Sequence, residues 1–405
     1  MVQNVFCRHC NEELKHTFVD LGMSPIANSF VDGEIASETH LPLRVFVCSG
    51  CFLVQLPVHE APDRIFNDYA YFSSYSDSWV RHAKRFAGEI VKELRLCKDS
   101  FVVEIASNDG YLLQHFIREG IEVLGIEPAI NVADAARAKG IPTDCAFFGT
   151  CYAKTLEGKK ADLVVANNVL AHVPDINDFV RGISRILNET GIATLEFPSV
   201  YNLIRHNQFD TIYHEHYSYL SLGAAIKIFS SNGLNLYDAQ ELPTHGGSLR
   251  VYATTRCKPM SQNAQDILDM ENKFGLNGLG AYEGFSQRVM TVKRKLLKTL
   301  IELKDSGKSI VGYGAAAKGN TLLNYCGIRS DFLDYVVDKS PHKQGKRLPG
   351  SLLPVHCPKK IALDKPDFVL ILPWNLEGEI MEQLSYVREW GCKFIVPIPD
   401  ARVVD

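Results

Sequence analysis

The sequence predicts an α/β protein in which a small cysteine-containing module precedes two Rossmann-like sheets. Two pairs of closely spaced cysteines lie near the N-terminus, where frequent glycine and proline leave little room for long helices. Short apolar runs then alternate with helical patterns over residues 101–197 and again over residues 309–396. Because strands that alternate with helices form right-handed βαβ units, each stretch predicts a mostly parallel sheet. We therefore expect three parts, over residues 1–68, 69–255 and 256–405.

Composition and charge argue against several classes of protein. The chain has 405 residues, of which 46% are hydrophobic and 22% charged, as in ordinary globular proteins of two or three domains. Its 43 basic and 47 acidic side chains leave a formal net charge of −4, which offers no electrostatic attraction to nucleic acid or an anionic membrane. We see no signal peptide and no apolar run long enough to span a membrane. We expect a cytoplasmic protein that binds neither nucleic acid nor membranes.

Two C-x2-C pairs near the N-terminus predict a structural zinc site. Four thiolates complete a tetrahedral zinc shell and leave no position open for chemistry. Ordinary buried cysteines or a redox pair are the alternative, and two independent pairs in one loop-rich segment argue against it. The odd total of 11 cysteines also argues against a disulfide framework. The expected ligands are Cys7, Cys10, Cys48 and Cys51.

The alternation of apolar and helical patterns places the elements of both sheets. Helical spacing predicts a first helix over residues 77–96, and a charged helical segment interrupted near residues 275–280 joins the two sheets. The expected strands are residues 101–105, 122–126, 163–166, 192–197, 309–313, 332–337, 368–371 and 393–396. The expected helices are residues 111–119, 132–139, 176–187, 262–304, a segment from 318, and 377–390.

The first strand of the central stretch leads into a loop, residues 103–110, with the layout of a nucleotide-binding turn before a helix. Small residues in such a loop let a ligand approach the backbone, and an acid that ends the next strand usually meets ribose hydroxyls. A tight βα turn that merely uses Gly110 is the alternative, and the acid at the next strand end favours the binding site. The candidate residues are Glu104, Ala106, Asn108, Gly110 and Glu127.

The pattern E-x-A-x-N-x-G of residues 104–110 resembles the first motif of class I S-adenosylmethionine-dependent methyltransferases. It departs from their usual E-x-G-x-G-x-G at Ala106 and Asn108, and it lacks the G-x-G-x-x-G of dinucleotide-binding loops. Residues 167–174, NNVLAHVP, resemble the methyltransferase segment that flanks the methionine moiety, with Asn168 and His172 as polar candidates. A strand-to-helix turn capped by Asn168 is the alternative.

The densest cluster of polar side chains is YHEHYSY, residues 213–219, after the strand that ends at residue 197. Histidine and glutamate can remove a proton near neutral pH, and tyrosine can donate a hydrogen bond to a developing oxyanion. An H-x-H metal site and a polar loop with satisfied histidines are the alternatives. The density of such groups after a sheet of this type favours chemistry, with Tyr213, Glu215 and His216 as candidates.

Three further segments combine aromatic, basic or hydroxyl side chains with glycine. Residues 69–76, with Tyr71 and Tyr75, suit a sugar or nucleotide pocket, or only an N-capping segment for the following helix. Residues 244–251 hold His245, Ser248 and Arg250, although the two glycines there can simply form a turn and Arg250 can simply be exposed. Residues 312–321, with Lys318 and Asn320, suit a pyrophosphate or a dinucleotide at a helix N-terminus.

Taken in order, these segments resemble one family, the sugar C-methyltransferases of deoxysugar biosynthesis. The matching elements span nearly the whole chain and are the two C-x2-C pairs, YFSSY at 71–75, EIASNDG at 104–110, YHEH at 213–216, HGGS at 245–248 and GYGAAAKGN at 312–320. The resemblance implies an N-terminal zinc module, a central class I methyltransferase domain that binds S-adenosylmethionine, and a C-terminal Rossmann-like domain that helps hold a nucleotide-linked sugar.

The resemblance also implies a substrate and roles for the candidate residues. The usual substrate is a 4-keto-6-deoxysugar, often linked to thymidine diphosphate, methylated commonly at C-3 and in some relatives at C-5. His216 would be the base, Glu215 would orient it or share its role, Tyr213 would hydrogen-bond near the reacting centre, and Tyr71 or Tyr75 would assist the enolate. A nicotinamide-dependent nucleotide-sugar oxidoreductase and a non-catalytic nucleotide-sugar-binding protein remain as alternatives, and we expect a monomer or a small homo-oligomer.

Overall fold

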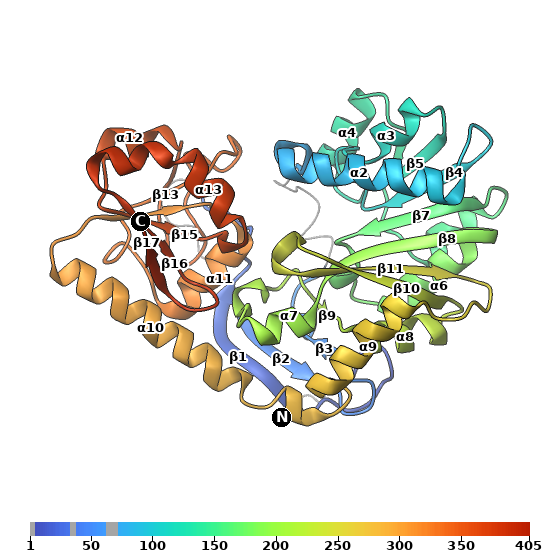
Figure 1. The fold of residues 1–405 in the computed structure, drawn as a ribbon, viewed down its shortest axis with the longest axis horizontal. Helices are drawn as coiled ribbons and strands as arrows, with labels where there is room; N and C mark the ends of the chain where they lie inside the picture. Colours follow the sequence, from blue (N-terminus) through green and yellow to red (C-terminus); the bar gives the residue numbers. More distant parts are fainter. Residues whose placement is uncertain (1–4, 33–37, 62–71) are drawn as a thin grey trace.

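The computed structural model describes residues 5–32, 38–61 and 72–405 and contains three sheets. A central seven-stranded sheet and a C-terminal six-stranded sheet form two lobes, and the long strands of the N-terminal module lie between them (Figure 1). In the described part of the chain, no helix is long and apolar enough to cross a membrane.

The central sheet has the strand order β10-β11-β8-β7-β4-β5-β6. Its strands are β4 (Phe101–Ile105), β5 (Glu122–Ile126), β6 (Thr143–Asp144), β7 (Ala161–Asn167), β8 (Leu187–Pro198), β10 (Asn235–Leu242) and β11 (Ser248–Thr254). The five neighbouring strands β8, β7, β4, β5 and β6 are parallel to one another. Strand β11 runs antiparallel to both of its neighbours, β8 and β10. Chain order reverses between β4 and β7, and parallel sheets bind ligands at the carboxyl edge of such a switch point.

Helices cover both faces of this sheet, which explains why its central parallel strands β4 and β7 are mostly apolar and buried. On one face, Val102 and Leu163 pack against Phe86 and Phe116. On the other face, Val103 packs in one cluster with Phe179 and Phe229 of two further helices. The helices are α2 (Asp77–Leu94), α3 (Leu113–Arg118), α4 (Ile130–Ala138), α5 (Thr150–Ala153), α6 (Ile176–Ile186), α7 (Val200–Arg205), α8 (Leu222–Ser231) and α9 (Gln262–Phe274).

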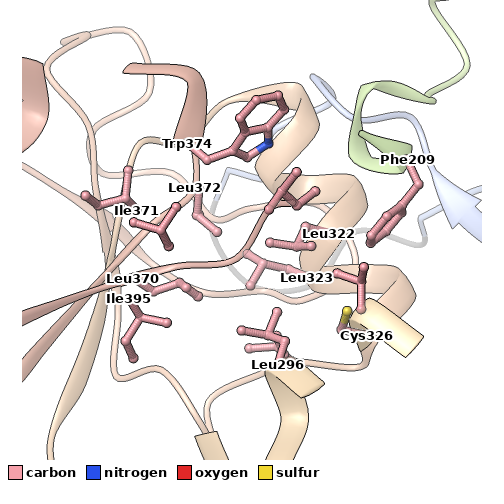
Figure 2. Packing of buried hydrophobic residues seen from close by; sticks show 14 of the residues in the cluster. Phe209, Leu296, Leu322, Leu323, Cys326, Leu370, Ile371, Leu372, Trp374 and Ile395 are labelled. Carbon is pink, nitrogen blue, oxygen red and sulfur yellow. The ribbon is translucent and has the colours of Figure 1, made fainter. Parts of the chain in front are cut away.

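The C-terminal lobe is a second, mostly parallel sheet of order β14-β13-β12-β15-β16-β17. Its strands are β12 (Ile310–Tyr313), β13 (Val336–Val337), β14 (Val355–His356), β15 (Phe368–Ile371), β16 (Lys393–Val396) and β17 (Arg402–Val404). Its helices are α10 (Phe285–Asp305), α11 (Ala317–Cys326), α12 (Lys359–Asp364) and α13 (Glu377–Gln383). Figure 2 shows its core, in which side chains of α10, α11 and β15 pack together with Phe209 from outside the lobe.

The N-terminal module is an antiparallel sheet that the rest of the chain completes. It contains β1 (His16–Pro25), β2 (His40–Val47) and β3 (Val54–Gln55). Strand β3 pairs with β9 (Ser218–Tyr219), which begins two residues after the YHEH segment. Strand β1 packs against α10 and α11 of the C-terminal lobe. The module is therefore the structural link between the two lobes.

The predicted α/β fold class is confirmed. Predicted strands 101–105, 122–126, 368–371 and 393–396 match β4, β5, β15 and β16 to the residue. The interruption near 275–280 divides the long helical segment into α9 and α10, whereas the predicted strand 332–337 shortens to β13. Helix α9 packs on β10 and α8 of the central lobe, although it follows the expected boundary at residue 255.

Candidate functional site

The four predicted zinc ligands converge in the N-terminal module. The sulfur atoms of Cys7, Cys10, Cys48 and Cys51 all lie within 4.8 Å of one another. Tetrahedral ligation with bonds of about 2.3 Å places thiolates roughly 3.8 Å apart, so the donor set fits zinc. Gln55 Nε2 lies 3.1 Å from Cys7 Sγ and donates to it, the kind of outer contact that orients a metal-bound thiolate. Zinc bound here is structural, because all four positions are protein ligands.

The loop after β4 has the backbone of a ligand-binding turn. Ala106, Asn108 and Gly110 adopt φ of 55°, 51° and 77°, in the left-handed region. A Cβ on Gly110 would lie 2.0 Å from Ile141 Cδ1, so a side chain does not fit there. Across the switch point, Asn168 also has a positive φ of 53°, and its Oδ1 is buried without a hydrogen-bond partner among the described residues. Such a cradle with an unused acceptor suits a polar ligand.

Two buried carboxylates frame this loop. Glu127 Oε2 accepts from the Asn108 amide (3.0 Å) and Oε1 accepts from the Ala129 amide (2.9 Å). Burial raises the pKa of Glu127 to about 7, although these two hydrogen bonds oppose the shift. Glu104 is buried on β4. Burial raises the pKa of Glu104 well above its usual range, and the negative charge of neighbouring Glu127 adds to the shift. Polar contacts from a ligand would offset the cost of burying both acids.

A short segment before α2 closes over the loop, and sequence reasoning did not anticipate its contacts. The Ser73 amide donates to Asn108 Oδ1 (2.8 Å), and Ser74 Oγ donates to Asp109 Oδ2. Lys139 Nζ pairs with the same Asp109 oxygen at 2.8 Å. The segment forms the 3-10 helix η1 (Ser73–Tyr75), and Ser76 then caps α2, as the capping interpretation predicted.

Of the two candidate tyrosines, Tyr71 lies outside the described residues. Tyr75 is 58% exposed, stacks on His342 of the C-terminal lobe, and has its hydroxyl 3.4 Å from His342 Nε2. Among the described residues, the Tyr75 ring contacts Phe72 and, in the C-terminal lobe, His342, and no contact with His216 is seen.

His216 lies at the centre of a buried cluster of imidazoles. His216 Nδ1 donates to the Thr211 carbonyl (2.9 Å), and the Tyr213 hydroxyl lies 2.8 Å from His216 Nε2. Because a carbonyl only accepts, Nδ1 carries the proton of the neutral ring and Nε2 keeps its lone pair. Burial, and then the charges of nearby His172, His245 and Lys318, lower the pKa of His216 well below its usual value. The ring is a neutral base at neutral pH.

His172 shows the same arrangement. Its Nδ1 donates to the Glu215 carbonyl (2.8 Å), and its ring centroid lies 4.6 Å from that of His216. Although part of the ring remains accessible to solvent, burial lowers the pKa of His172 to about 4. Two neutral imidazoles therefore meet where the central sheet faces the C-terminal lobe.

The Glu215 carboxylate is held by a residue of the N-terminal module. Asn28 Nδ2 donates to both carboxylate oxygens at 2.8 Å. Burial raises the pKa of Glu215 to about 7, and the bond from Asn28 opposes this shift. The contacts that orient His216 come from Thr211 and Tyr213. No motif in the sequence pointed to Asn28, since asparagine in a loop has no recognisable spacing.

The candidates of the HGGS segment lie in different surroundings. His245 packs edge-on against Trp79 at 5.4 Å, and burial lowers its pKa to about 4. Ser248 Oγ donates to the Thr244 carbonyl (3.0 Å). Arg250 is 4% exposed and pairs with Glu196, with Nε donating to Oε1 at 2.8 Å, so the interpretation of Arg250 as an exposed side chain is wrong.

The two candidates from the C-terminal lobe stand at the start of α11. Lys318 Nζ donates to Asn375 Oδ1 (2.7 Å) and lies 4.8 Å from the centre of the Trp374 ring. Asn320 is 1% exposed, and neither its Oδ1 nor its Nδ2 has a partner among the described residues. The structure thus brings His172, His216, His245 and Lys318 together from both lobes.

The doubly wound sheet, its left-handed loop and the acid at the next strand end define a class I S-adenosylmethionine-dependent methyltransferase. Three family models match consecutive parts of the chain. These are "Putative zinc binding domain" over residues 7–66, "Methyltransferase domain" over residues 79–239 and "C-methyltransferase C-terminal domain" over residues 243–399.

A curated relative matches from end to end. The chain is 34% identical to C-methyltransferase NovU of Streptomyces niveus over 404 residues, which cover 98% of this chain and 96% of NovU. It is also 31% identical over 120 residues to a ubiquinone biosynthesis O-methyltransferase of Azorhizobium caulinodans, covering 29% of this chain and 46% of that protein. The chain therefore belongs to the C-methyltransferase family and is an S-adenosylmethionine-dependent C-methyltransferase.

Two solved methyltransferases each align with less than half of the chain. A methyltransferase of Clostridium acetobutylicum aligns with 43% of this chain and 91% of its own, at 13% identity and a TM-score of 0.36. Magnesium protoporphyrin IX methyltransferase of Synechocystis, with bound S-adenosylmethionine, aligns with 48% of this chain and 89% of its own, at 17% identity and a TM-score of 0.34.

Proposed function

We propose that this C-methyltransferase acts on a nucleotide-linked 4-keto-6-deoxysugar, carried by thymidine diphosphate and methylated at C-3. The observation that carries the proposal is the neutral His216, whose Nε2 is poised to accept a proton beside the Tyr213 hydroxyl. Methylation of carbon needs a carbanion equivalent, and a carbon next to a ketone is acidic enough for an imidazole to deprotonate. A keto sugar meets that requirement, whereas a sugar without the carbonyl does not.

The residues of the cluster divide the work. His216 Nε2 removes the proton from C-3, and the electron pair left behind forms the enolate with the C-4 oxygen. The Tyr213 hydroxyl turns from Nε2 to that oxygen and stabilises its charge. S-adenosylmethionine, when bound, supplies an electrophilic sulfonium methyl group. The enolate carbon bonds to this methyl as the carbon–sulfur bond breaks, and the electron pair stays on sulfur.

The remaining candidates would hold the two substrates. In this proposal the methyl-donor site is surrounded by the candidates of the loop after β4, the next strand end and the segment after β7, which are Glu104, Ala106, Asn108, Gly110, Glu127, Asn168 and His172. In this proposal the side that faces the sugar nucleotide is formed by Lys318 and Asn320 of the C-terminal lobe together with His245, Ser248 and Arg250 of the central lobe. Lys318 supplies a positive charge for the diphosphate. We retain residues 1–68, 69–255 and 256–405 as the proposed domains, and a monomer or small homo-oligomer as the proposed assembly.

The test is turnover with a matched pair of substrates. The chain is incubated with S-adenosylmethionine and either a thymidine-diphosphate 4-keto-6-deoxysugar or its 4-hydroxy counterpart. We expect a product one methylene heavier from the keto sugar alone, with the new methyl on C-3 by NMR. A methyl on C-5 would overturn the position, and turnover of the hydroxy sugar would overturn the enolate mechanism.

A second measurement separates proton removal from methyl transfer. In D2O, with S-adenosylhomocysteine in place of the donor, the wild type should exchange the C-3 proton of the keto sugar. His216→Asn should slow this exchange roughly 100-fold or more. Titration with S-adenosylhomocysteine should show binding by both proteins, and titration with NAD+ should show none. Exchange that survives in His216→Asn would assign the base elsewhere.

A further inference from the structure

The protonation site of His216 depends on one backbone carbonyl. Thr211 belongs to the 3-10 helix η4 (Phe209–Thr211), which lies between α7 and the YHEH segment. Its oxygen is 2.9 Å from His216 Nδ1, and this contact selects the tautomer with the proton on Nδ1. A displacement of η4 would remove the acceptor and allow the proton to move to Nε2. What holds η4 therefore decides which nitrogen is the base.

The C-terminal lobe contacts η4 and its C-cap residue Ile212. Trp374 Nε1 donates to Asp210 Oδ2 (2.7 Å), and Thr321 Oγ1 on α11 donates to the Ile212 carbonyl (3.0 Å). The Phe209 ring lies edge-on to Tyr325 with 5.3 Å between centroids. Figure 2 shows Phe209 beside α11 and Trp374 at the edge of the same core. Each η4 contact named here comes from a part of the chain more than 100 residues away.

These contacts are buried and therefore matter energetically. Asp210 is 0% exposed and Thr321 is 1% exposed. A buried carboxylate that loses a donor costs more free energy than an exposed one, because water cannot replace the bond. Loss of the indole N–H would remove the side-chain donor of the Asp210 carboxylate, and we expect η4 to shift in compensation.

The Trp374 ring itself has little freedom to move. Lys318 Nζ lies 4.8 Å from its centre, and a Cβ placed on Gly246 would approach its Cη2 to 2.6 Å. The indole is thus packed between the start of α11 and the HGGS segment of the central lobe. A rigid ring is suited to hold Asp210 in one place.

We propose that Trp374 and Thr321 are positioning residues that act through η4 to keep the His216 proton on Nδ1. The C-terminal lobe then sets the basic atom of the active site in addition to its part in binding. The effect on catalysis rests on the proposed role of His216 as the base. The position of the proton on the His216 ring does not depend on that role.

The experiment is NMR of the zinc-loaded full chain labelled with 15N-histidine, since ring nitrogen shifts distinguish a protonated from an unprotonated nitrogen. His216→Asn assigns the signal. In the wild type we expect protonated Nδ1 and unprotonated Nε2. Trp374→Phe removes the indole donor together with part of the buried ring, and Thr321→Val removes one donor at similar volume. Both should show a new signal for protonated Nε2 at neutral pH.

Matched controls are Trp390→Phe and Thr291→Val. Trp390 Nε1 donates to the Pro366 carbonyl (3.0 Å) in the same lobe, and Thr291 Oγ1 donates to Gln287 within α10 (3.0 Å). Neither contact involves η4, so both controls should keep the wild-type His216 signal. If Trp374→Phe does not fold, Thr321→Val alone decides the result. Unchanged His216 shifts in the folded variants would overturn the inference.

Turnover then separates this inference from the proposed function. We expect kcat for the keto sugar to fall roughly 10–100-fold in Trp374→Phe, with unchanged affinity for S-adenosylhomocysteine. A changed tautomer with unchanged kcat supports the positioning role and contradicts His216 as the base. An unchanged tautomer overturns the positioning role and leaves the proposed function standing.

Discussion

At the scale of single residues, hydrogen-bond direction decides the chemistry that each imidazole can perform. His172 and His216 each give their Nδ1 proton to a carbonyl, of Glu215 and Thr211 respectively. Both rings are left with an Nε2 lone pair, and burial keeps both neutral. The density of polar groups in YHEH predicted such a site, but the acceptors are backbone atoms that no motif displays.

The Tyr213 hydroxyl can be tested alone. We expect Tyr213→Phe to lower kcat roughly 10–100-fold, because the oxyanion loses one donor, and to leave the affinity for S-adenosylhomocysteine unchanged. The control is Tyr152→Phe, which removes a hydroxyl bonded to Asp144 on the edge strand β6. Steady-state kinetics measure both. Equal effects of the two variants would count against a role for Tyr213 at the reacting centre.

Buried His172 makes stability depend on pH. Its pKa is about 4 in the folded chain and 6.5 in an unfolded one. Below pH 6.5 the unfolded state binds the proton more readily, so this contribution is complete above about pH 6.5 and is lost as pH falls towards 4. The shift corresponds to about 3 kcal/mol, and partial solvent exposure of the ring reduces it to about 1–2 kcal/mol.

We therefore expect His172→Asn to lose less stability than the wild type between pH 7.5 and pH 4.5. Urea unfolding at both pH values measures the difference. The pKa values of Glu127 and Glu215 are raised to about 7, so these two groups lower the stability of the fold as pH rises towards 7.5. Both groups are present in the wild type and in the variant, so their effect cancels in the comparison. A parallel loss of stability in wild type and variant would mean that His172 is not the group responsible.

At the scale of elements, the buried strands β4 and β7 and the tight turns that follow them form the carboxyl edge of the central sheet. The apolar runs at residues 101–105 and 163–166 predict strands of a mostly parallel sheet, and the structure confirms both as the parallel neighbours β4 and β7. The closure of η1 over the loop was not predictable, because Ser73 and Ser74 contact residues 35 positions away. Serines in a loop carry no signal for such a contact.

Asp109 tests whether η1 closes the methyl-donor site. Asp109→Ala removes the acceptor of Ser74 and the partner of Lys139, and leaves the Ser73–Asn108 contact as the remaining hydrogen bond named here between η1 and the loop. We expect the Kd for S-adenosylhomocysteine to rise about 10-fold, since lost charged hydrogen bonds of this kind are worth about 1.5 kcal/mol. Calorimetric titration measures the affinity.

The control for this change is Asp134→Ala, which breaks an exposed pair with Arg137 on α4. It should leave the affinity unchanged, because exposed pairs contribute little. A wild-type affinity in Asp109→Ala would show that the η1 contacts are independent of donor binding.

At the scale of the whole molecule, the N-terminal module connects the zinc site to the YHEH segment. Strand β3 pairs with β9, one residue beyond Tyr217, and Asn28 of the module holds the Glu215 carboxylate. The module therefore supports the YHEH segment from the side opposite to the C-terminal lobe. Loss of zinc should affect catalysis although the metal takes no part in it.

We expect zinc removal by a strong chelator, or Cys48→Ser, to lower Tm by about 5–10 °C and to abolish most turnover. Binding of S-adenosylhomocysteine should persist, because the loop after β4 does not contact the cysteines. Thermal unfolding, metal analysis and titration test this, with exposed Cys145→Ser as the control. Full activity of the metal-free chain would contradict the supporting role of the module.

The sequence by itself determined the local features of this protein. Helical and strand periodicity, the spacing of the C-x2-C pairs and the order of the EIASNDG, YHEH and GYGAAAKGN segments are properties of neighbouring residues, so they predict elements, zinc ligands and family. The tertiary structure alone decided which distant groups meet. Asn28 reaches Glu215, Trp374 reaches Asp210 and Glu196 takes up Arg250. These contacts depend on how three sheets pack, and packing is set by the shape of whole buried surfaces rather than by the pattern of any one segment.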